Sequence, residues 1–136
     1  MTSNTVQGSC LCGAVSFKCE NRFNQFHFCH CIQCQKATGS AHVANLFTDV
    51  DNIEWLSGED LCQRYDVPNR TISSAFCKTC GSPVPYPSLS GKSLVVPAGA
   101  LNDAPNIAPQ DNIFWAERAT WYDEGIKSKC YKGFPE

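Results

Sequence analysis

The chain has 136 residues, 43% of them apolar and 11% aromatic, which is the length of one domain and a composition typical of folded proteins. Its formal net charge of −2 argues against nucleic acid as a partner, because phosphates require a basic surface. No apolar run could span a bilayer, and the first nine residues lack the features of a secretory signal. We therefore expect one cytoplasmic domain over residues 1–136 with no membrane partner.

The elements that the sequence predicts are mainly short strands. Runs of alternating or continuous apolar residues predict strands at 15–20, 43–47, 61–66, 72–76, 94–96 and 113–115. One helix is predicted over 32–38, because Gly39 stands at the C-terminal position that glycine prefers. Short strands divided by turn residues favour a mainly β fold, a small antiparallel sandwich or open barrel with at most short helices.

Ten cysteines are the outlying feature of the composition. Cysteines at this density form either a disulfide framework or metal sites. Disulfides need an oxidising compartment, so we rank a secreted, disulfide-rich protein last. Metal thiolates are favoured because seven of the ten fall into close groups, namely Cys10, Cys12, Cys29, Cys31, Cys34, Cys77 and Cys80.

The first predicted metal site combines two short cysteine motifs. Cys77 and Cys80 enclose two residues and precede a glycine, which is typical of a zinc knuckle. A closed tetrahedral site needs four ligands, and Cys10 with Cys12, also followed by glycine, is the natural partner pair. We expect a structural Zn²⁺ on these four cysteines whose binding stabilises the fold. The alternative is a redox Cys-x-x-Cys, but the sequence offers no βαβ unit for it.

The second predicted metal site lies within residues 29–34. Cys29, Cys31 and Cys34 supply three ligands, which would leave one open position on a tetrahedral zinc, the pattern of a reactive site. A zinc with three thiolates favours a thiol as the next ligand over hydrolytic chemistry. His30 lies between two of the ligands and is expected to point away. Spacing leaves a fourth ligand open, and the candidates are His27, His30, His42, Cys19, Cys62 and Cys130.

Together these motifs and their neighbours resemble a known family. The resemblance rests on residues 8–17, 29–39, 76–83 and 98–103, with Trp121. In this order they are similar to the glutathione-dependent formaldehyde-activating enzyme family, which also includes centromere protein V. The resemblance implies a zinc-bearing fold of the β-tent type with two Zn²⁺ per chain. It implies that the zinc on Cys10, Cys12, Cys77 and Cys80 is structural and that the zinc on Cys29, Cys31 and Cys34 is catalytic.

The resemblance also implies an activity. Family members join glutathione and formaldehyde into S-hydroxymethylglutathione and are classed as carbon–sulfur lyases. We therefore predict a zinc-dependent lyase or synthase acting on adducts of a glutathione-type thiol with formaldehyde or another small aldehyde. Lys36 is a candidate for binding substrate carboxylates because it follows Cys34 closely.

Two positions depart from the family pattern. Asn112 stands where the family often has histidine, and Gln35 stands where it often has a basic residue.

The second hypothesis for the function is a non-catalytic zinc module that binds glutathione or a protein partner. A free coordination position on the second zinc would favour the enzyme, whereas a fourth protein ligand would favour the module.

Overall fold

The computed structural model describes residues 4–135, and the fold is mainly β, as predicted. The strands are β1 (Thr5–Ser9), β2 (Ser16–Glu20), β3 (Gln25–Cys29), β4 (Val43–Asp49), β5 (Glu54–Ser57), β6 (Cys62–Asp66), β7 (Ser73–Cys77), β8 (Tyr86–Pro87), β9 (Ser93–Pro97) and β10 (Asp111–Ile113). The helices are α1 (Ile32–Thr38) and α2 (Tyr122–Lys127), and the 3-10 turns are η1 (Glu59–Leu61), η2 (Ala98–Ala100) and η3 (Trp115–Glu117).

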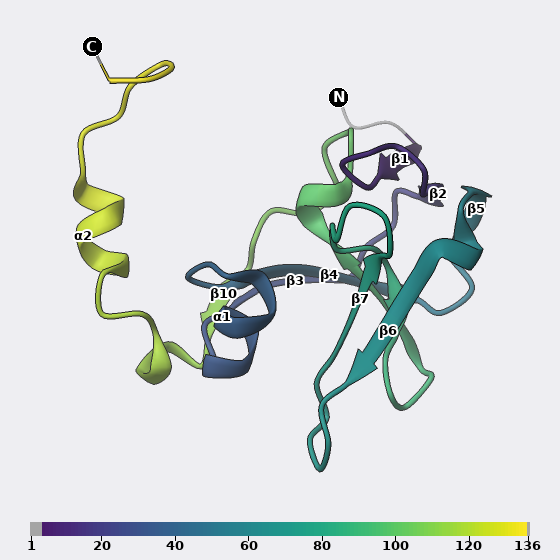
Figure 1. Ribbon diagram of the computed structural model, residues 1–136, viewed down its shortest axis with the longest axis horizontal. Helices are drawn as coiled ribbons and strands as arrows, with labels where there is room; N and C mark the ends of the chain where they lie inside the picture. Colours follow the sequence, from purple (N-terminus) through teal and green to yellow (C-terminus); the bar gives the residue numbers. More distant parts are fainter. Residues whose placement is uncertain (1–3, 136) are drawn as a thin grey trace.

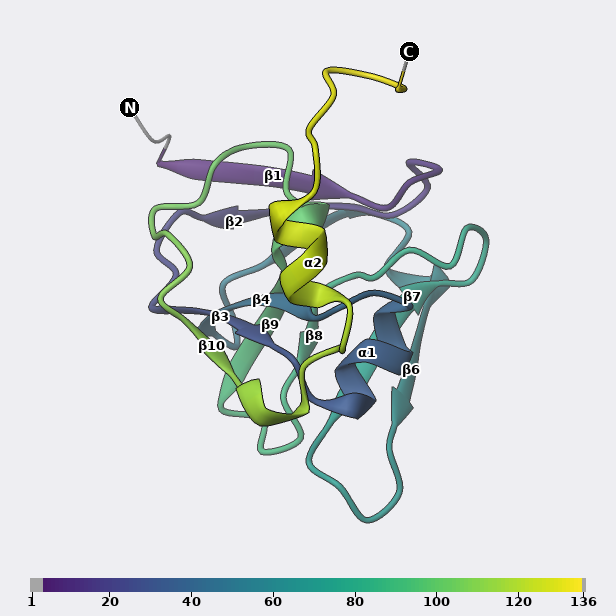
Figure 2. The ribbon, with the colours of Figure 1, turned by 90° about the vertical axis from the view of Figure 1, so that its left-hand side faces the viewer.

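The strands form three sheets. They have the orders β1-β2-β5, β10-β3-β4-β9-β8 and β6-β7. Every strand pair is antiparallel except β10 with β3, which is parallel. In Figure 2, β1 and β2 lie across the top of the molecule, the five-stranded sheet lies below them, and α1 and the β6–β7 hairpin lie toward the lower right. Cys10 and Cys12 lie between β1 and β2 and Cys77 ends β7, whereas the segment 29–34 lies where β3 leads into α1.

Two clusters of buried side chains hold the sheets together. The larger packs β1 and β2 against the five-stranded sheet and contains Val6, Phe17, Cys19, Phe23, Phe26, Leu46, Leu94 and Val96. The smaller contains Cys10, Val15, Ala75, Cys77 and Val84. Trp55 packs against both clusters. Because the smaller cluster includes two cysteines of the predicted structural zinc site, that site is part of a core.

The predicted helix has the predicted bounds, and its ends explain why it forms. Cys31 is the N-cap, and its Sγ accepts a hydrogen bond from the amide of Cys34 at 3.3 Å. Gly39 adopts the left-handed conformation (φ 66°), and its amide donates to the carbonyl of Gln35 at 2.7 Å. Since β3 ends at Cys29, the three neighbouring cysteines lie at the junction of a strand and a helix.

The strand predicted at 113–115 is wrong beyond Ile113. Phe114 has a left-handed backbone (φ 54°), and η3 begins at Trp115. Trp115, the last residue of this apolar run, does not continue the sheet. Its ring instead packs edge-on against His30, with centroids 5.0 Å apart. The sequence analysis also missed the strands β1, β3, β5 and β8, the helix α2 and the 3-10 turns η1, η2 and η3.

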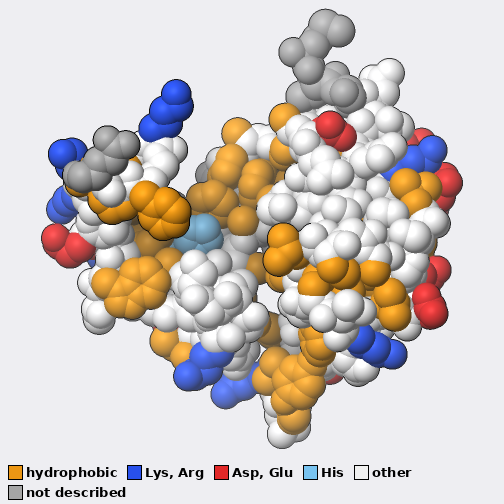
Figure 3. Space-filling model, turned by 45° about the horizontal axis from the view of Figure 1, so that its top comes forward, with side chains coloured by type: hydrophobic (Ala, Val, Ile, Leu, Met, Phe, Trp, Pro, Cys, Tyr) orange, Lys and Arg blue, Asp and Glu red, His pale blue; other side chains and the backbone are white. Residues whose placement is uncertain are grey.

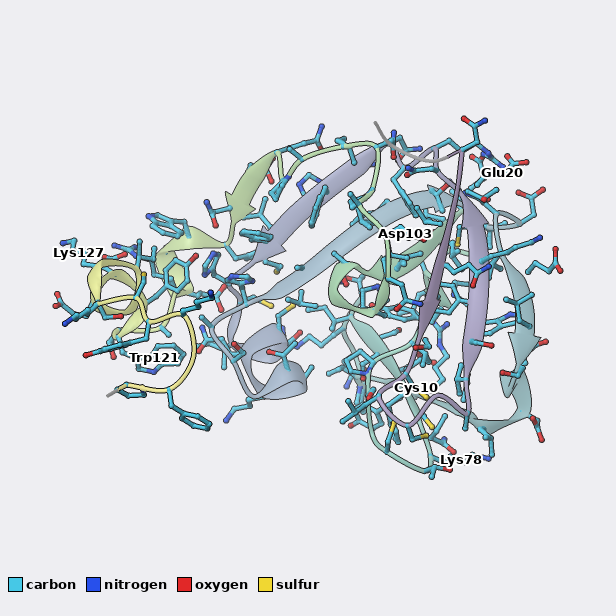
Figure 4. All side chains as sticks on the ribbon, turned by 90° about the horizontal axis from the view of Figure 1, so that it is seen from above. Cys10, Glu20, Lys78, Asp103, Trp121 and Lys127 are labelled. Atoms are coloured by element: carbon cyan, nitrogen blue, oxygen red, sulfur yellow. The ribbon has the colours of Figure 1, made fainter. Side chains whose placement is uncertain are left out.

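The C-terminal arm, residues 118–135, extends from the sheets and carries α2 (Figures 1 and 2). Tyr122 attaches it to the body through edge-on contacts with His30 and His42, at centroid distances of 4.8 and 5.7 Å. Trp121 lies on the same arm and is exposed (Figure 4). No helix within residues 4–135 is long and apolar enough to cross a bilayer.

Candidate metal centres and the adjoining cavity

The structure brings Cys10, Cys12, Cys77 and Cys80 together. Their four Sγ atoms lie within 4.8 Å of one another, with Cys10 and Cys12 separated by 3.6 Å and Cys12 and Cys77 by 4.0 Å. Four sulfurs about 2.3 Å from a tetrahedral zinc would lie about 3.8 Å apart. The donor set therefore fits a closed Zn²⁺ site. Figure 4 shows Cys10 with other sulfur atoms beside it, in the lower part of the view.

Turn geometry and hydrogen bonds hold this four-cysteine group. Gly13 (φ 82°) and Gly81 (φ 77°) have left-handed backbones, which other residues rarely adopt. The amide of Leu11 donates to Oγ of Ser82 at 3.0 Å and so connects the two motifs. The hydroxyl and amide of Ser82 lower the pKa of the Cys80 thiol to about 5. Cys80 is therefore a thiolate at neutral pH, the form that binds zinc.

The structure also brings Cys29, Cys31 and Cys34 together, with their Sγ atoms within 4.8 Å of one another. Cys31 and Cys34 are buried, and Cys29 is half-buried. Among the described residues, no further Cys, His, Asp or Glu atom belongs to this group. Within residues 4–135, these three thiols could hold a metal ion and would leave one position of a tetrahedral zinc for another ligand.

The candidate fourth ligands are engaged or placed elsewhere. His30 is fully buried and points away from the sulfurs, since its Nε2 donates to Oδ1 of Asn112 at 2.8 Å. His27 Nδ1 contacts the Asp111 carboxylate at 2.5 Å, and His42 stacks on a phenylalanine of β3. The remaining candidate sulfurs lie in the core, on β6 and on the C-terminal arm, in Cys19, Cys62 and Cys130.

The electrostatics of the three-cysteine group also suit a cation. Burial raises the pKa of the Cys34 thiol, and hydrogen bonds with the thiols of Cys31 and Cys29 raise it further. Burial likewise raises the pKa of Cys29. Several thiolates in this space repel one another unless a cation compensates their charge. A divalent ion supplies that charge and deprotonates the thiols that coordinate it.

A cavity of about 430 Å³ adjoins the three-cysteine group. Cys29 and Cys34 contribute to its wall, together with residues of α1, β4, β7, β8 and β9. Its volume lies in the range of small-molecule sites, about 300–1,000 Å³. Tyr86 and Asn45 also line it. Burial raises the pKa of Tyr86 to about 12, with a further contribution from Cys34, so its hydroxyl stays protonated at neutral pH.

The substrate-binding residue that the sequence predicted, Lys36, lies outside the cavity. Lys36 is an exposed residue of α1 and does not line the cavity wall. Its neighbour Gln35 is half-buried and has a defined role, because its Nε2 donates to the carbonyls of His30 (2.8 Å) and Glu117 (2.9 Å). The Glu117 carboxylate accepts from the amide of Ile32 at 3.1 Å, at the start of α1.

The two departures from the family pattern therefore hold the three-cysteine loop. Asn112 binds the histidine between two of the cysteines, and Gln35 ties α1 to η3. The sequence analysis missed the contribution of Glu117. No local signal could have revealed it, because its partner Ile32 lies 85 positions away in the sequence.

The fold and site define a class, a small mainly β protein with two cysteine groups suited to zinc, one closed and one beside a cavity. A sequence model of the glutathione-dependent formaldehyde-activating enzyme family matches residues 5–117. The chain therefore belongs to this family, as its motifs predicted.

A curated relative agrees with this assignment, and a solved structure shares the fold. The chain is 26% identical over 141 residues to a curated protein of Halomonas elongata that is provisionally named a glutathione-dependent formaldehyde-activating enzyme. This alignment covers 96% of the chain and 89% of the relative. A Rhodobacter sphaeroides protein of known crystal structure matches with a TM-score of 0.60 and 22% identity, over 78% of this chain and 97% of that one. The latter is a likeness of fold alone.

Proposed function

We propose that this chain is a zinc-dependent carbon–sulfur lyase or synthase that joins a thiol to formaldehyde or another small aldehyde, and that also cleaves the adduct. The observation that carries the proposal is the position of Cys29 and Cys34, two members of an incomplete ligand set, in the wall of a cavity. The names of the family and of the Halomonas elongata relative supply glutathione and formaldehyde as the first substrates to test.

The proposed reaction is an addition. The thiol sulfur forms a bond to the carbonyl carbon, the π electrons of the carbonyl move to its oxygen, and that oxygen takes the proton that the thiol has lost. Cleavage is the exact reverse. A zinc held by Cys29, Cys31 and Cys34 would supply the positive charge that favours the thiolate form of a bound thiol. The cavity would hold the thiol and aldehyde close enough to react.

Tyr86 is the residue of this cavity suited to the carbonyl oxygen. Its hydroxyl is protonated at neutral pH and lies in a site that Cys34 also lines. A fixed hydroxyl donor stabilises negative charge that develops on oxygen and can deliver a proton to it. We assign Tyr86 this role.

The four-cysteine group has a different role in this proposal. A zinc on Cys10, Cys12, Cys77 and Cys80 would have no position left for substrate, so we assign it to stability and expect two Zn²⁺ per chain.

None of the ten cysteines forms a disulfide bond in the structure, which suits a reducing compartment such as the cytoplasm. We assign residues 1–136 to one zinc domain.

The test compares two cysteine variants of the zinc-loaded protein. Calorimetry measures glutathione binding, and NMR measures formation of S-hydroxymethylglutathione from glutathione and formaldehyde above the uncatalysed rate. Cys31→Ser should lose one zinc, thiol binding and turnover while staying folded. Cys130→Ser is the matched control, because Cys130 lies exposed on the C-terminal arm, and it should behave like wild type. Full turnover in Cys31→Ser would refute this assignment of the catalytic centre.

A tyrosine variant separates the enzyme from the non-catalytic module. Tyr86→Phe keeps the ring and removes the hydroxyl. It should lower the rate by about 100-fold, the usual cost of losing one oxyanion donor, while thiol binding and zinc content remain unchanged. If the wild-type protein binds thiols but does not accelerate the reaction at all, the chain is a binding module.

A further inference from the structure

Outside its two cysteines, the cavity wall has one titratable side chain among the described residues besides the tyrosine, His27. Both ring nitrogens of His27 are already engaged, Nδ1 with the Asp111 carboxylate at 2.5 Å and Nε2 with the Gln25 side-chain oxygen at 2.9 Å. The described lining has no lysine, arginine, aspartate or glutamate, and its other polar groups are neutral hydroxyls and amides, such as those of Ser74 and Tyr86. At neutral pH glutathione carries two carboxylates and one ammonium group. Moving those charges from water into this cavity costs free energy, because its wall offers them no unpaired charged side chain.

Two basic residues in elements that border the cavity do not change this. Lys36 is exposed and lies outside the cavity wall. The guanidinium of Arg64 lies 5.5 Å from the centre of the Tyr86 ring, but each of its three nitrogens already donates one hydrogen bond within the protein. They bind the Asp66 carboxylate at 2.8 Å, the Ser73 hydroxyl at 3.2 Å and a backbone carbonyl of β8. Arg64 is thus paired with an acidic side chain and Lys36 is outside the wall, so neither places an unpaired cation in the cavity.

The rest of the wall is apolar. Side chains from several elements contribute, including Ile72, Phe76, Leu89, Val95 and Phe114. On the face that Figure 3 shows, hydrophobic side chains gather around the hollows at its centre, and acidic side chains lie mainly toward its edges. An apolar ligand that covers this wall would bind favourably, because both apolar surfaces are removed from water.

Phe114 is the most exposed aromatic residue among the described residues of the cavity wall, and its backbone conformation is unusual. Its backbone is left-handed (φ 54°, ψ 41°), a conformation unfavourable for a bulky residue. Its ring is 59% exposed and lines the cavity, so burial within the protein does not compensate for this backbone. The flanking residues impose the conformation, since the Ile113 carbonyl accepts from the His30 amide at 3.0 Å and Trp115 packs on the His30 ring. The chain thus presents an aromatic ring at the cavity rim.

We propose that the thiol taken by this site has an uncharged, apolar body, as an alkyl or aryl thiol has, and that it is preferred over the charged tripeptide glutathione. The inference rests on the proposed carbon–sulfur chemistry and assigns its substrate class. The sulfur lies at the Cys29 and Cys34 end of the cavity, and the apolar body packs against the wall and Phe114. The bond that forms is the same one, between the thiol sulfur and the aldehyde carbon.

The experiment titrates the zinc-loaded protein with three thiols at one pH. They are 2-phenylethanethiol, glutathione and 2-mercaptoethanol, which has almost no body, and each affinity is corrected for the thiolate fraction. We expect 2-phenylethanethiol to bind at least about tenfold tighter than the other two, because only it buries apolar surface without burying charge. Cys31→Ser should abolish the binding of all three.

Phe114→Ala tests the aromatic rim. It should weaken 2-phenylethanethiol by about tenfold and leave 2-mercaptoethanol unchanged, since only the former reaches the ring. The matched control is Phe134→Ala, because Phe134 is 93% exposed and lies near the end of the C-terminal arm, away from the cavity. Equal affinities of wild type and Phe114→Ala for 2-phenylethanethiol would show that Phe114 does not contact the bound thiol.

A charge-introducing variant tests the same preference from the opposite direction. Leu89 lines the cavity and Leu56 does not, yet the two are similarly exposed, at 48% and 45%. Leu89→Lys should shift the preference toward glutathione, and Leu56→Lys should not. If wild type binds glutathione more tightly than 2-phenylethanethiol, through Cys31, the inference is overturned while the proposed function stands. If none of the three thiols binds, the proposed function fails and this inference with it.

Discussion

The two cysteine groups differ in where their ligands come from and in what they face. The four-cysteine group joins parts of the chain far apart, since Cys12 and Cys77 are 65 positions from each other. Two of its members, Cys10 and Cys77, are buried in the smaller core. The three-cysteine group comes from one continuous segment, residues 29–34, and two of its members face a cavity.

This difference separates a stabilising role from a chemical one. A metal that binds distant segments adds its binding free energy to the folded state. A metal bound within one turn restrains little of the chain and adds less to global stability, but its remaining position is accessible to a small molecule. The same ligand type can therefore serve both roles, and the number and surroundings of the ligands decide which.

Cys77→Ser tests the stabilising role and should have the largest effect. A serine hydroxyl is a poor zinc ligand, so the variant should lose one zinc and at least about 3 kcal/mol of unfolding free energy. Denaturant unfolding and metal analysis measure these quantities. Cys62→Ser is the control, because Cys62 pairs with Cys77 across β6 and β7 but is not in the group. Two zinc ions and normal stability in Cys77→Ser would contradict the assignment.

Graded chelation should separate the two centres in the wild-type protein. Three protein ligands retain zinc less firmly than four, and the three-cysteine group is next to a cavity through which a chelator can reach it. We expect the first zinc to leave with loss of thiol binding and only a small decrease in the melting temperature. Removal of the second should unfold the protein. Loss of both in a single step coincident with unfolding would show that the centres are not distinct.

The sequence predicted what depends on local spacing. The helix over 32–38 was confirmed at both ends, because Cys31 and Gly39 act as caps within the segment itself. The two cysteine groups were also grouped correctly. Their short spacings and the glycines after Cys12 and Cys80 are local features that constrain the backbone directly.

The sequence could not predict what depends on tertiary packing. The run 113–115 is apolar enough for a strand, but packing of Trp115 on His30 turns the chain at Phe114. The cavity combines residues of several elements, and the absence of lysine, arginine, aspartate and glutamate from its described lining is apparent only after they assemble. Lys36 follows Cys34 closely in sequence, yet the helix directs it to the surface and places it outside the cavity wall.

The smallest effect should come from Gln35, which supports only the three-cysteine group. Gln35→Ala removes the hydrogen bonds that join α1 to the carbonyls of His30 and Glu117. Loss of such supporting contacts lowers metal affinity by about tenfold or somewhat more. Zinc affinity at this centre should fall by that amount, while the four-cysteine group keeps its zinc, as competition with a chromophoric chelator would measure. Gln33→Ala, on the same helix, gains the same helix propensity and serves as control. Equal zinc affinities of the two variants would mean that Gln35 does not support the centre.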